Sequence, residues 1–439
     1  MKVMKFGGTS VGKPERMQHI ASLLIKETEP AIVVLSALSG TTNALVEIGN
    51  NIAKGDRHNA QQVIAKLEDH YAAFIRALLQ KEETYNKAKD IVAEHFDFLN
   101  IILKISFSEA LSKDILAQGE LLSTKIFCTY LEEIGADFAL LPALEFMSID
   151  ENEEPQIGSI RTKLTHLLEQ HKGTKILVTQ GYICRNARGE VDNLKRGGSD
   201  YTASLVAAAI NASVCEIWTD IDGMHNNDPR IVDKTVPVEQ LSFEEAAELA
   251  YFGAKILHPA SIWPAQQYKI PVKLLNTMDP EAKGTLITQE AASSGVKAVA
   301  AKDNIIAIKI KSGRMLLAYG FLRKVFEVFE KYKTPIDMIT TSEVAVSLTI
   351  DTHEHLDQIV KELEALGHVE VDENQAIISV VGDNINETEE IIKKLFGSLR
   401  NIPIRMVSYG GSRHNISLLV SAENKNLLLQ QLNKGMFGL

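Results

Sequence analysis

The sequence predicts a doubly wound α/β domain over residues 1–290, followed by two small α+β modules over 300–372 and 373–439. Strand-like and helix-like patterns alternate through the first part, which is typical of a parallel sheet covered by helices on both faces. In the tail, short strands alternate with single helices twice, and the pattern Pro-Ile-x-Met at 335–338 returns at 403–406. The repeat predicts a duplicated module, although two common strand–helix patterns could coincide in this way.

The composition limits the class of protein. The chain has 439 residues, 45% of them hydrophobic, and a formal net charge of −11, which suits two or three globular domains. The absence of a basic run argues against a nucleic acid or an anionic membrane as partner, and no apolar stretch reaches membrane-spanning length. Isolated cysteines and a strand-like run directly after Met1 predict a cytoplasmic protein without a leader.

The first element is a short strand at 3–6 that runs into Gly7 and Gly8, before Pro14 opens an amphipathic helix. The spacing from Gly7 to Lys13 fits the start of a Walker A loop. That motif needs Ser or Thr where this chain has Pro14, so we reject a P-loop. The remaining interpretation places Lys5 at a strand end, directed at whatever the glycine loop binds.

A second strand at 31–35 ends in a hydroxyl-rich loop that contains Ser36 and Thr42. The long helical pattern at 59–103 predicts a helical lid or an oligomer face. A further helix carries Glu120, which could be a solvated carboxylate or a ligand for a substrate amine; the sequence alone favours the solvated carboxylate.

The sequence from Arg196 to Asp200 places two glycines between an arginine and a Ser-Asp pair, ahead of a small-residue helix. Free amides, the helix dipole and the guanidinium would all favour an anion there. An ordinary glycine turn before a capped helix would give the same pattern. Strands at 138–141, 175–179 and 215–218 extend the sheet.

In a doubly wound sheet, the loops after the carboxyl ends of the strands share one crevice. Several glycines and charged or hydroxylated residues fall on such loops, namely Lys5, Gly7, Gly8, Ser36, Gly197, Gly198, Thr219 and Asp220. Their convergence predicts a site for nucleotide phosphates.

Five segments occur in one order, namely Lys5-Phe6-Gly7-Gly8-Thr9-Ser10, Arg196-Gly197-Gly198-Ser199-Asp200, Trp218-Thr219-Asp220, Asp228-Pro229-Arg230 and Phe252-Gly253-Ala254-Lys255. Together they resemble the aspartokinases, a branch of the amino-acid kinase family. The duplicated tail resembles their paired, ferredoxin-like ACT domains. Phe321-Leu322 and Thr340-Thr341-Ser342-Glu343 are similar to the effector region of the lysine-sensitive, single-function class.

The resemblance implies phosphoryl transfer from ATP, with Mg²⁺, to the side-chain carboxylate of L-aspartate. The product, 4-phospho-L-aspartate, would enter the pathway to lysine, threonine and methionine. The implied catalytic residues are Lys5 and Asp200. The implied nucleotide-binding residues are Lys5, Gly7, Gly8, Thr219, Asp220, His225, Arg230 and Lys255. The implied substrate-binding residues are Ser36, Thr42, Glu120, Tyr182, Arg196 and Ser199.

The resemblance also implies feedback inhibition by an amino acid, with L-lysine favoured, and a homodimer formed through the ACT modules. The implied effector residues are Met315, Gly320, Phe321, Leu322, Asp337, Ser342 and Glu343. A helix that begins near Gly320 offers amides for an α-carboxylate, and Asp337 offers a counter-charge for an ammonium.

Two departures from the family pattern matter: His225 stands where a tyrosine is common, and Leu317 and Ala318 replace polar residues of the effector loop. Two alternatives stay open. The chain could phosphorylate another acidic substrate, such as glutamate, acetylglutamate or carbamate, or it could be a catalytically silent amino-acid sensor. The presence of Lys5, Asp200 and Lys255 weighs against the silent sensor.

Overall fold

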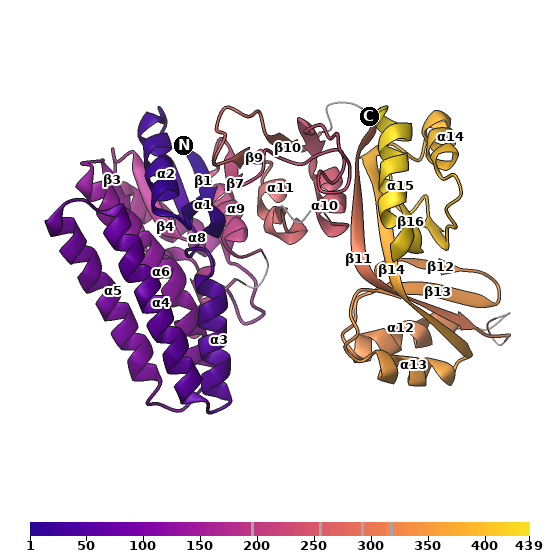
Figure 1. The fold of residues 1–439 in the computed structure, drawn as a ribbon, viewed down its shortest axis with the longest axis horizontal. Helices are drawn as coiled ribbons and strands as arrows, with labels where there is room; N and C mark the ends of the chain where they lie inside the picture. The colour runs from indigo at the N-terminus through magenta and orange to yellow at the C-terminus, as the bar shows by residue number, and fades with distance from the viewer. Residues whose placement is uncertain (195–196, 254–256, 291–293, 314, 316–318) are drawn as a thin grey trace. The chain divides into compact units, whose positions relative to one another are not determined.

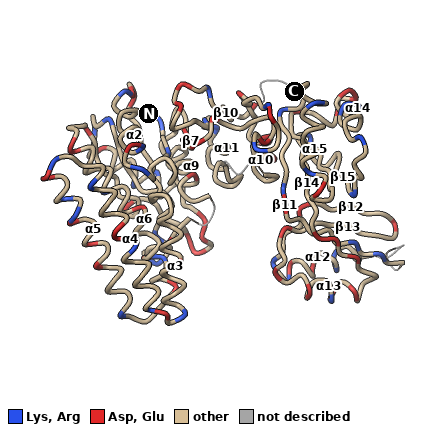
Figure 2. Tube along the Cα trace, viewed as in Figure 1, with Lys and Arg blue, Asp and Glu red and all other residues tan. Residues whose placement is uncertain are grey.

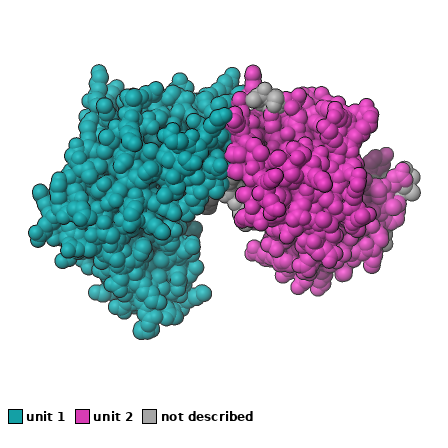
Figure 3. All heavy atoms as spheres, turned by 45° about the horizontal axis from the view of Figure 1, so that its top comes forward, with its two compact units in different colours: residues 1–223, 256–289 teal, residues 224–255, 290–439 magenta. Residues whose placement is uncertain are grey.

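The computed structural model describes residues 1–194, 197–253, 257–290, 294–313, 315 and 319–439 (Figure 1). The chain divides into two compact units, one of residues 1–223 and 256–289 and the other of residues 224–255 and 290–439 (Figure 3). The predicted first domain therefore contributes residues 224–255 to the second unit. Figure 2 shows Lys and Arg interspersed with Asp and Glu along the helices of both units. No described helix is both long and apolar enough to cross a membrane.

The first unit contains the predicted alternation of strands and helices. Its strands are β1 (Lys2–Phe6), β2 (Ala31–Leu35), β3 (Phe138–Leu140), β4 (Ile176–Gln180), β5 (Ile183–Arg185), β6 (Val191–Asn193), β7 (Cys215–Thr219), β9 (Val272–Asn276) and β10 (Thr285–Thr288). Its helices are α1 (Gly8–Val11), α2 (Pro14–Lys26), α3 (Thr41–Ala53), α4 (Arg57–Leu78), α5 (Glu82–Ile102), α6 (Glu109–Glu133), α7 (Ala143–Phe146), α8 (Ile157–Gln170), α9 (Gly198–Ile210) and α11 (Trp263–Gln267), with a 3₁₀ turn at Pro259–Ser261.

The strands of this unit lie in the order β3-β4-β2-β1-β7-β9-β10, with β5 and β6 paired as a separate hairpin. Every pair from β3 to β9 is parallel, and β10 is antiparallel to β9. All five residues of β2 are buried, as expected for a central strand of a parallel sheet. The predicted doubly wound fold is confirmed.

The two faces of the sheet pack against different helices. Met4 and Phe6 of β1 lie in a core shared with α2, α4 and α6. Helix α9 contacts β1, β2 and β7, and successive side chains of a strand point to opposite faces. The alternation therefore places Lys5 on the face of β1 opposite Met4 and Phe6, which is the face that α9 covers.

Helices α3, α4, α5 and α6 pack against one another beside the sheet (Figure 1). The long helical pattern predicted at 59–103 is two helices, α4 and α5. The break is fixed from outside the segment: the Glu133 carboxylate on α6 accepts hydrogen bonds from the backbone N–H groups of Gln80 and Lys81. No glycine or proline marks this break in the sequence, and these backbone N–H groups just before α5 are instead satisfied by a side chain of another helix.

The second unit joins residues 224–255 to the tail. Its elements are β8 (Gln240–Ser242), α10 (Phe243–Tyr251), β11 (Gly295–Lys311), α12 (Phe321–Lys331), β12 (Ile339–Thr341), β13 (Ala345–Ile350), α13 (Leu356–Glu364), β14 (His368–Asp383), α14 (Glu389–Ser398), β15 (Met406–Ser408), β16 (Asn415–Ser421), a 3₁₀ turn at Ala422–Asn424, α15 (Lys425–Leu432) and a π-helix at Asn433–Phe437. A capping box between Ser242 and Glu245 starts α10.

The tail forms one antiparallel sheet in the order β12-β13-β11-β14-β16-β15. Helices α12 and α13 cover one core and α14 and α15 cover another, at opposite ends of β11 and β14 (Figure 1). The two predicted modules are thus present and share their longest strands. Each long strand carries an asparagine with positive φ near the junction, Asn304 at 59° and Asn374 at 56°, a conformation that asparagine tolerates better than most residues.

The two modules are interleaved. Residues 305–311 of β11 pair with 368–375 of β14, whereas residues 295–302 pair with 377–383. Residues that precede the first module therefore complete the sheet of the second. The predicted ranges 300–372 and 373–439 cut through both long strands, because a sequential division cannot describe strands that serve two cores.

Candidate active site and effector region

Lys5 and Asp200 form an ion pair at the centre of the first unit. Lys5 Nζ lies 2.6 Å from Asp200 Oδ1, and the two side chains are 11% and 15% exposed. Strand β1 supplies the lysine on its α9 face, and the first turn of α9 supplies the aspartate. The pair holds a cation at the carboxyl end of a central strand, where the sheet's ligand crevice is expected.

Glycines line the approach to this cation. A Cβ on Gly7 would lie 3.2 Å from Lys5 Nζ, and one on Gly8 would lie 3.1 Å from the Ala37 carbonyl oxygen. Any larger residue would crowd the amine or the neighbouring loop. The backbone N–H of Gly7 donates to the Trp218 carbonyl at 3.4 Å, so the loops after β1 and β7 are adjacent.

Thr219 and Asp220 continue from β7 beside this loop. The Thr219 hydroxyl donates to Asp220 Oδ1 at 3.2 Å, and Phe6 stacks on Trp218 with ring centroids 5.7 Å apart. Thr219 and Asp220, both predicted to bind the nucleotide, therefore lie at the same edge of the sheet as Gly7.

The loop after β2 joins α6 and α9. Ser36 Oγ donates to Ser199 Oγ at 2.8 Å, and the Ala37 backbone N–H donates to Glu120 Oε1 at 3.3 Å. Ser123 Oγ donates to the Ser36 carbonyl at 2.7 Å. Three predicted substrate residues, Ser36, Glu120 and Ser199, are therefore connected through one loop. Ser123 was not predicted, although its position one turn after Glu120 places both on one helix face.

Glu120 is buried, at 4% exposure, and not solvated as the sequence favoured. Burial raises the pKa of Glu120 to about 8, against the opposing effect of the Ala37 hydrogen bond. Its second oxygen, Oε2, has no hydrogen-bond partner among the described residues. A buried carboxyl with a free oxygen is suited to receive a cationic ligand group, which would repay its desolvation.

Tyr182 lies at a turn after β4, with φ of 66°. Its backbone N–H donates to Thr202 Oγ1 of α9 at 2.8 Å. Burial, followed by the nearby charge of Glu120, raises the pKa of its phenol to about 12. Tyr182 is therefore neutral at physiological pH.

Other predicted residues fall elsewhere. Thr42 is exposed in the first turn of α3, whereas its neighbour Thr41 is buried and hydrogen-bonded to Tyr71. Arg196 and Lys255 lie outside the residues that the structure describes, as do Leu317 and Ala318. Their predicted roles stay predictions.

His225 and Arg230 belong to the second unit. His225 Nδ1 is 2.7 Å from Thr235 Oγ1. The Arg230 guanidinium donates through Nε and Nη2 to the two carboxylate oxygens of Asp228, at 2.9 and 2.7 Å. This hydrogen bonding to Arg230 holds the pKa of Asp228 below its usual range.

Asp337, the predicted counter-charge for an effector ammonium, already has partners. Its carboxylate is 1% exposed, and Oδ1 lies 2.6 Å from Lys302 Nζ. Oδ1 also accepts the Tyr251 hydroxyl at 2.8 Å, while Oδ2 has no hydrogen-bond partner within the described parts of the chain. Lys302 also lies 2.9 Å from Asp351. Sequence reasoning missed Lys302 and Tyr251, which lie far from Asp337 along the chain.

The remaining predicted effector residues lie around α12 and β12. Gly320 is the N-cap of α12 with φ of 78°, Phe321 is buried, and Leu322 is exposed. Met315 packs against the core of the first module, and Glu343 is exposed. Ser342 lines a cavity of about 520 Å³ whose lining residues do not include Asp337. Two members of the predicted set are thus separated, because Asp337 is a buried carboxylate and Ser342 lines a cavity that does not include it.

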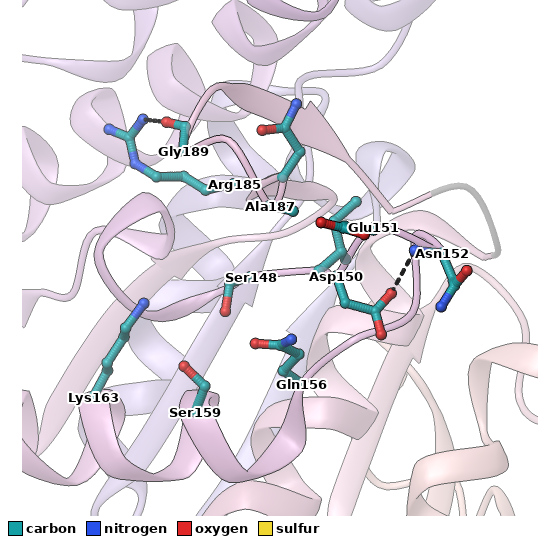
Figure 4. Close-up of a pocket in the computed structure, with 12 residues that line it drawn as sticks. Ser148, Asp150, Glu151, Asn152, Gln156, Ser159, Lys163, Arg185, Ala187 and Gly189 are labelled. Atoms are coloured by element: carbon teal, nitrogen blue, oxygen red, sulfur yellow. Dashed lines mark hydrogen bonds between the residues drawn. The ribbon is translucent and has the colours of Figure 1, made fainter.

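A larger cavity, of about 610 Å³, lies among α8, the β5–β6 hairpin and the loop before α8 (Figure 4). Asp150, Lys163 and Arg185 are among its polar lining residues. None of the predicted site residues that the structure describes lines it.

Among the described residues there is no cluster of three or more His, Cys, Asp or Glu that could hold a metal. Mg²⁺ in kinases is usually bound by substrate phosphates, water and one or two carboxylates. Asp200, beside Lys5 at the crevice, is a carboxylate of that kind, so the residues present fit such a metal.

Comparisons with known proteins agree with the fold. Residues 1–276 match the amino acid kinase family, and residues 378–435 match an ACT domain. The chain is 32% identical over 450 residues to lysine-sensitive aspartokinase 3 of Escherichia coli, covering 99% of each chain. It is 35% identical over 464 residues to the chloroplastic aspartokinase 3 of Arabidopsis thaliana, covering 99% of this chain and 81% of that relative.

Solved structures share the fold along the whole chain. The E. coli aspartokinase III complex with aspartate and ADP has a TM-score of 0.84 at 32% identity, covering 100% of both chains. The complex of that enzyme with lysine and aspartate has a TM-score of 0.83 at 32% identity, covering 100% of this chain and 99% of that one. The aspartate kinase of Clostridium acetobutylicum has the same fold, with a TM-score of 0.82 at 24% identity over 99% of this chain and 100% of that one.

Proposed function

Because the chain belongs to the amino acid kinase family, and to its aspartokinases with ACT domains, we propose that it phosphorylates L-aspartate. The reaction transfers the γ-phosphoryl group of MgATP to the side-chain carboxylate and yields 4-phospho-L-aspartate. This is the first step of the pathway from aspartate to lysine, threonine and methionine.

The Lys5–Asp200 pair is the observation that supports this proposal most strongly. The nucleophile is already an anion, so the reaction needs no strong base. It needs two anions brought into line and the charge on the transferring group neutralised. Lys5 supplies that positive charge, and the Gly7 and Gly8 loop lets the phosphates approach it. Asp200 orients Lys5 and would offer a carboxylate oxygen to Mg²⁺ bound with the nucleotide. That metal would supply further positive charge at the phosphates.

Glu120 receives the substrate ammonium in this proposal. An ammonium pairs with the free Oε2 and favours the ionised carboxyl. Ser36 and Ser199, which are hydrogen-bonded to each other, and Tyr182 shape the same pocket. Thr42 and Arg196 complete it, with the Arg196 guanidinium on the α-carboxylate, where a planar fork gives a two-pronged contact.

The nucleotide is bound by Thr219, Asp220, Arg230 and Lys255, with His225 near the base. E. coli aspartokinase III has been solved with aspartate and ADP, which supports ATP as the phosphoryl donor here. The described cysteines are all free and buried, which supports a reducing, cytoplasmic location.

The interleaved modules provide regulation in this proposal. L-Lysine binds at the first module and favours a low-activity state, and the modules pair two chains into a homodimer. The support is the similarity to a lysine-sensitive aspartokinase and to an aspartokinase structure with lysine and aspartate. Binding can inhibit only through such a preference between states.

The test is ADP formation by the purified protein with ATP, Mg²⁺ and one candidate substrate at a time. We expect turnover with L-aspartate and not with L-glutamate or N-acetyl-L-glutamate, and less turnover when L-lysine is added. Equal turnover with another acidic substrate would favour a different kinase of the family. Aspartate binding without turnover would favour the silent sensor.

A further inference from the structure

The loop that carries Arg230 has little structure of its own. Residues 224–239 form neither helix nor strand, apart from an isolated bridge between His225 and Pro237. Some of its backbone groups pair within the loop, such as the Val238 N–H with the Met224 carbonyl at 2.7 Å, and others have partners elsewhere. One is β11, where the Val299 N–H donates to the Asn226 carbonyl at 2.8 Å.

A second anchor is the C-terminal helix of the second module. Asn227 Nδ2 donates to the Leu429 carbonyl, in the last turn of α15, at 3.0 Å and to Asn433 Oδ1 at 3.2 Å. Asn227 Oδ1 accepts the Asp228 backbone N–H at 2.9 Å. The side chain is 3% exposed, so a buried amide uses its donor group to join the loop to α15 and its acceptor to hold Asp228 within the loop.

Asn433 makes a hydrogen bond in the reverse direction, from the C-terminal π-helix to the loop. It is 4% exposed, at the start of the π-helix, and its Nδ2 donates to the Lys234 carbonyl at 3.0 Å. Asn227 and Asn433 thus bond to each other, and each also bonds to the other's segment. Gln430 adds a weaker contact to the Ile231 carbonyl at 3.4 Å.

Arg230 lies between the anchored positions 227 and 234. Its side chain is 82% exposed and is directed by Asp228, whose backbone N–H is bonded to Asn227. Holding a flexible arginine and its loop before the ligand arrives lowers the ordering cost of binding.

We propose that Asn227 and Asn433 are positioning residues of the nucleotide site. Through them, the second ACT module holds the Asp228-Pro229-Arg230 loop in the conformation that presents Arg230 to nucleotide phosphates. This inference rests on the proposed nucleotide role of Arg230.

A purely structural role predicts a different result. Helix α15 is held in its core by Leu428, Leu429 and Leu432, all fully buried. Truncating Asn433 therefore leaves the apolar packing of the module intact. If the amide pair served only stability, its loss would lower the melting temperature and affect both substrates alike.

The experiment is a double-mutant cycle with Asn433→Ala, Arg230→Ala and the double variant. For each we measure kcat, KM for ATP, KM for aspartate, and the Kd of ADP by calorimetry. Asn433→Ala should raise KM for ATP and the Kd of ADP by about five- to tenfold, the value of one or two hydrogen bonds, with KM for aspartate unchanged. The double variant should bind no more weakly than Arg230→Ala alone, because Asn433 acts through that arginine.

The matched control is Gln431→Ala, whose side chain donates to the Arg400 carbonyl at 3.2 Å and not to the loop; its KM for ATP should equal that of the parent. If Asn433→Ala loses secondary structure by circular dichroism, Asn433→Asp replaces it. That variant keeps an oxygen for Asn227 but lacks the donor to Lys234, so the same selective rise is expected.

Three outcomes would overturn the inference. Normal ADP binding by Asn433→Ala, with weakened binding by Arg230→Ala, refutes the positioning role of the asparagines and leaves the proposed function standing. Normal ADP binding by Arg230→Ala refutes the nucleotide role of that residue, and with it the positioning role of Asn227 and Asn433. A parallel rise in both KM values with a lower melting temperature assigns the asparagines to stability. Failure of the parent to phosphorylate aspartate while it still binds ADP would count against the proposed function alone.

Discussion

At the residue scale, Lys5 is the side chain on which the proposed chemistry depends most. It sits at the end of a central parallel strand and pairs with Asp200 at 2.6 Å. Lys5→Ala should lower kcat by about 10²–10³, as expected for loss of a preorganised charge at the transferring group. The melting temperature should change little, because β1 keeps its buried Met4 and Phe6. Near-normal kcat in steady-state assays would remove Lys5 from the chemistry.

Glu120 gives a prediction in pH. Burial raises its pKa to about 8, so the free enzyme holds it largely protonated at neutral pH, whereas an ammonium requires the ionised form. KM for aspartate should therefore fall as pH rises, by up to about tenfold per unit below that pKa. In Glu120→Gln, KM should be higher and should lose this slope. A parallel slope in both proteins would assign the titration to another group.

The same group makes stability depend on pH. Its folded pKa lies above the ordinary carboxyl value, so the native state binds more protons than the unfolded state between those two values. Stability contributed at Glu120 is therefore present at low pH and falls as pH rises through that window. Glu120→Gln should have a higher melting temperature than the parent at pH 8 and a similar one at pH 5. The opposite order would show that Glu120 is ionised and paired in the free protein.

Sequence reasoning located many candidate residues but could not describe their environment. Lys5 lies at the end of β1, Ser36 follows β2, and Ser199 and Asp200 begin α9; contacts between these elements bring the four residues together. The burial of Glu120 was not predictable, because it depends on packing against the loop after β2, far away in the chain. The partners of Asp337, namely Tyr251 and Lys302, escaped prediction because they too are far away in the chain.

At the scale of elements, the turn between α4 and α5 depends on a single side chain. Glu133 accepts hydrogen bonds from the Gln80 and Lys81 N–H groups and from the Thr84 hydroxyl. Burial by itself would raise the pKa of Glu133, but these hydrogen bonds together hold it below its usual range. Its contribution to stability is therefore present at neutral pH and is lost as pH falls through the folded pKa.

Glu133→Ala should lower the free energy of unfolding by about 1–3 kcal/mol, because it removes the acceptor of the half-buried Gln80 and Lys81 N–H bonds and of the buried Thr84 hydroxyl bond. Glu132→Ala is the control, since the Glu132 side chain pairs only with the exposed Lys87 in the described contacts. Urea denaturation of both variants measures the difference. Equal stabilities would show that water satisfies the helix terminus equally well.

Elements with their own patterns were predicted closely, and those set by distant contacts were not. The strand at 31–35 is β2 as predicted, because five consecutive apolar residues suit a strand that is buried on both faces. The break between α4 and α5 is fixed by a glutamate of another helix. The continuity of β11 and β14 across two modules is marked only by Asn304 and Asn374, whose positive φ the sequence does not reveal.

At the scale of the whole molecule, regulation should depend on Asp337. Tyr251, the last residue of α10, and Lys302 both bind its Oδ1. An effector ammonium must compete with these partners, so removing Asp337 and removing the Tyr251 hydroxyl should change inhibition by lysine in opposite directions. Asp337→Ala should abolish inhibition by L-lysine. Tyr251→Phe removes one competing hydrogen bond and should lower the inhibitory lysine concentration by about three- to tenfold.

Inhibition curves for lysine, recorded at fixed ATP and aspartate, measure both effects. The uninhibited kcat of each variant is the control and should match the parent. Equal inhibition of Asp337→Ala and the parent would place the effector elsewhere. Weaker inhibition of Tyr251→Phe would make its hydroxyl part of the inhibited state.

The identity of the phosphorylated product tests the central claim most directly. Phosphorus NMR of a reaction with ATP, Mg²⁺ and L-aspartate should show an acyl phosphate formed in step with ADP, and hydroxylamine should convert it to the side-chain hydroxamate of aspartate. Lys5→Ala should form it far more slowly. ADP released with inorganic phosphate alone, or an acyl phosphate formed equally well from L-glutamate, would contradict the account.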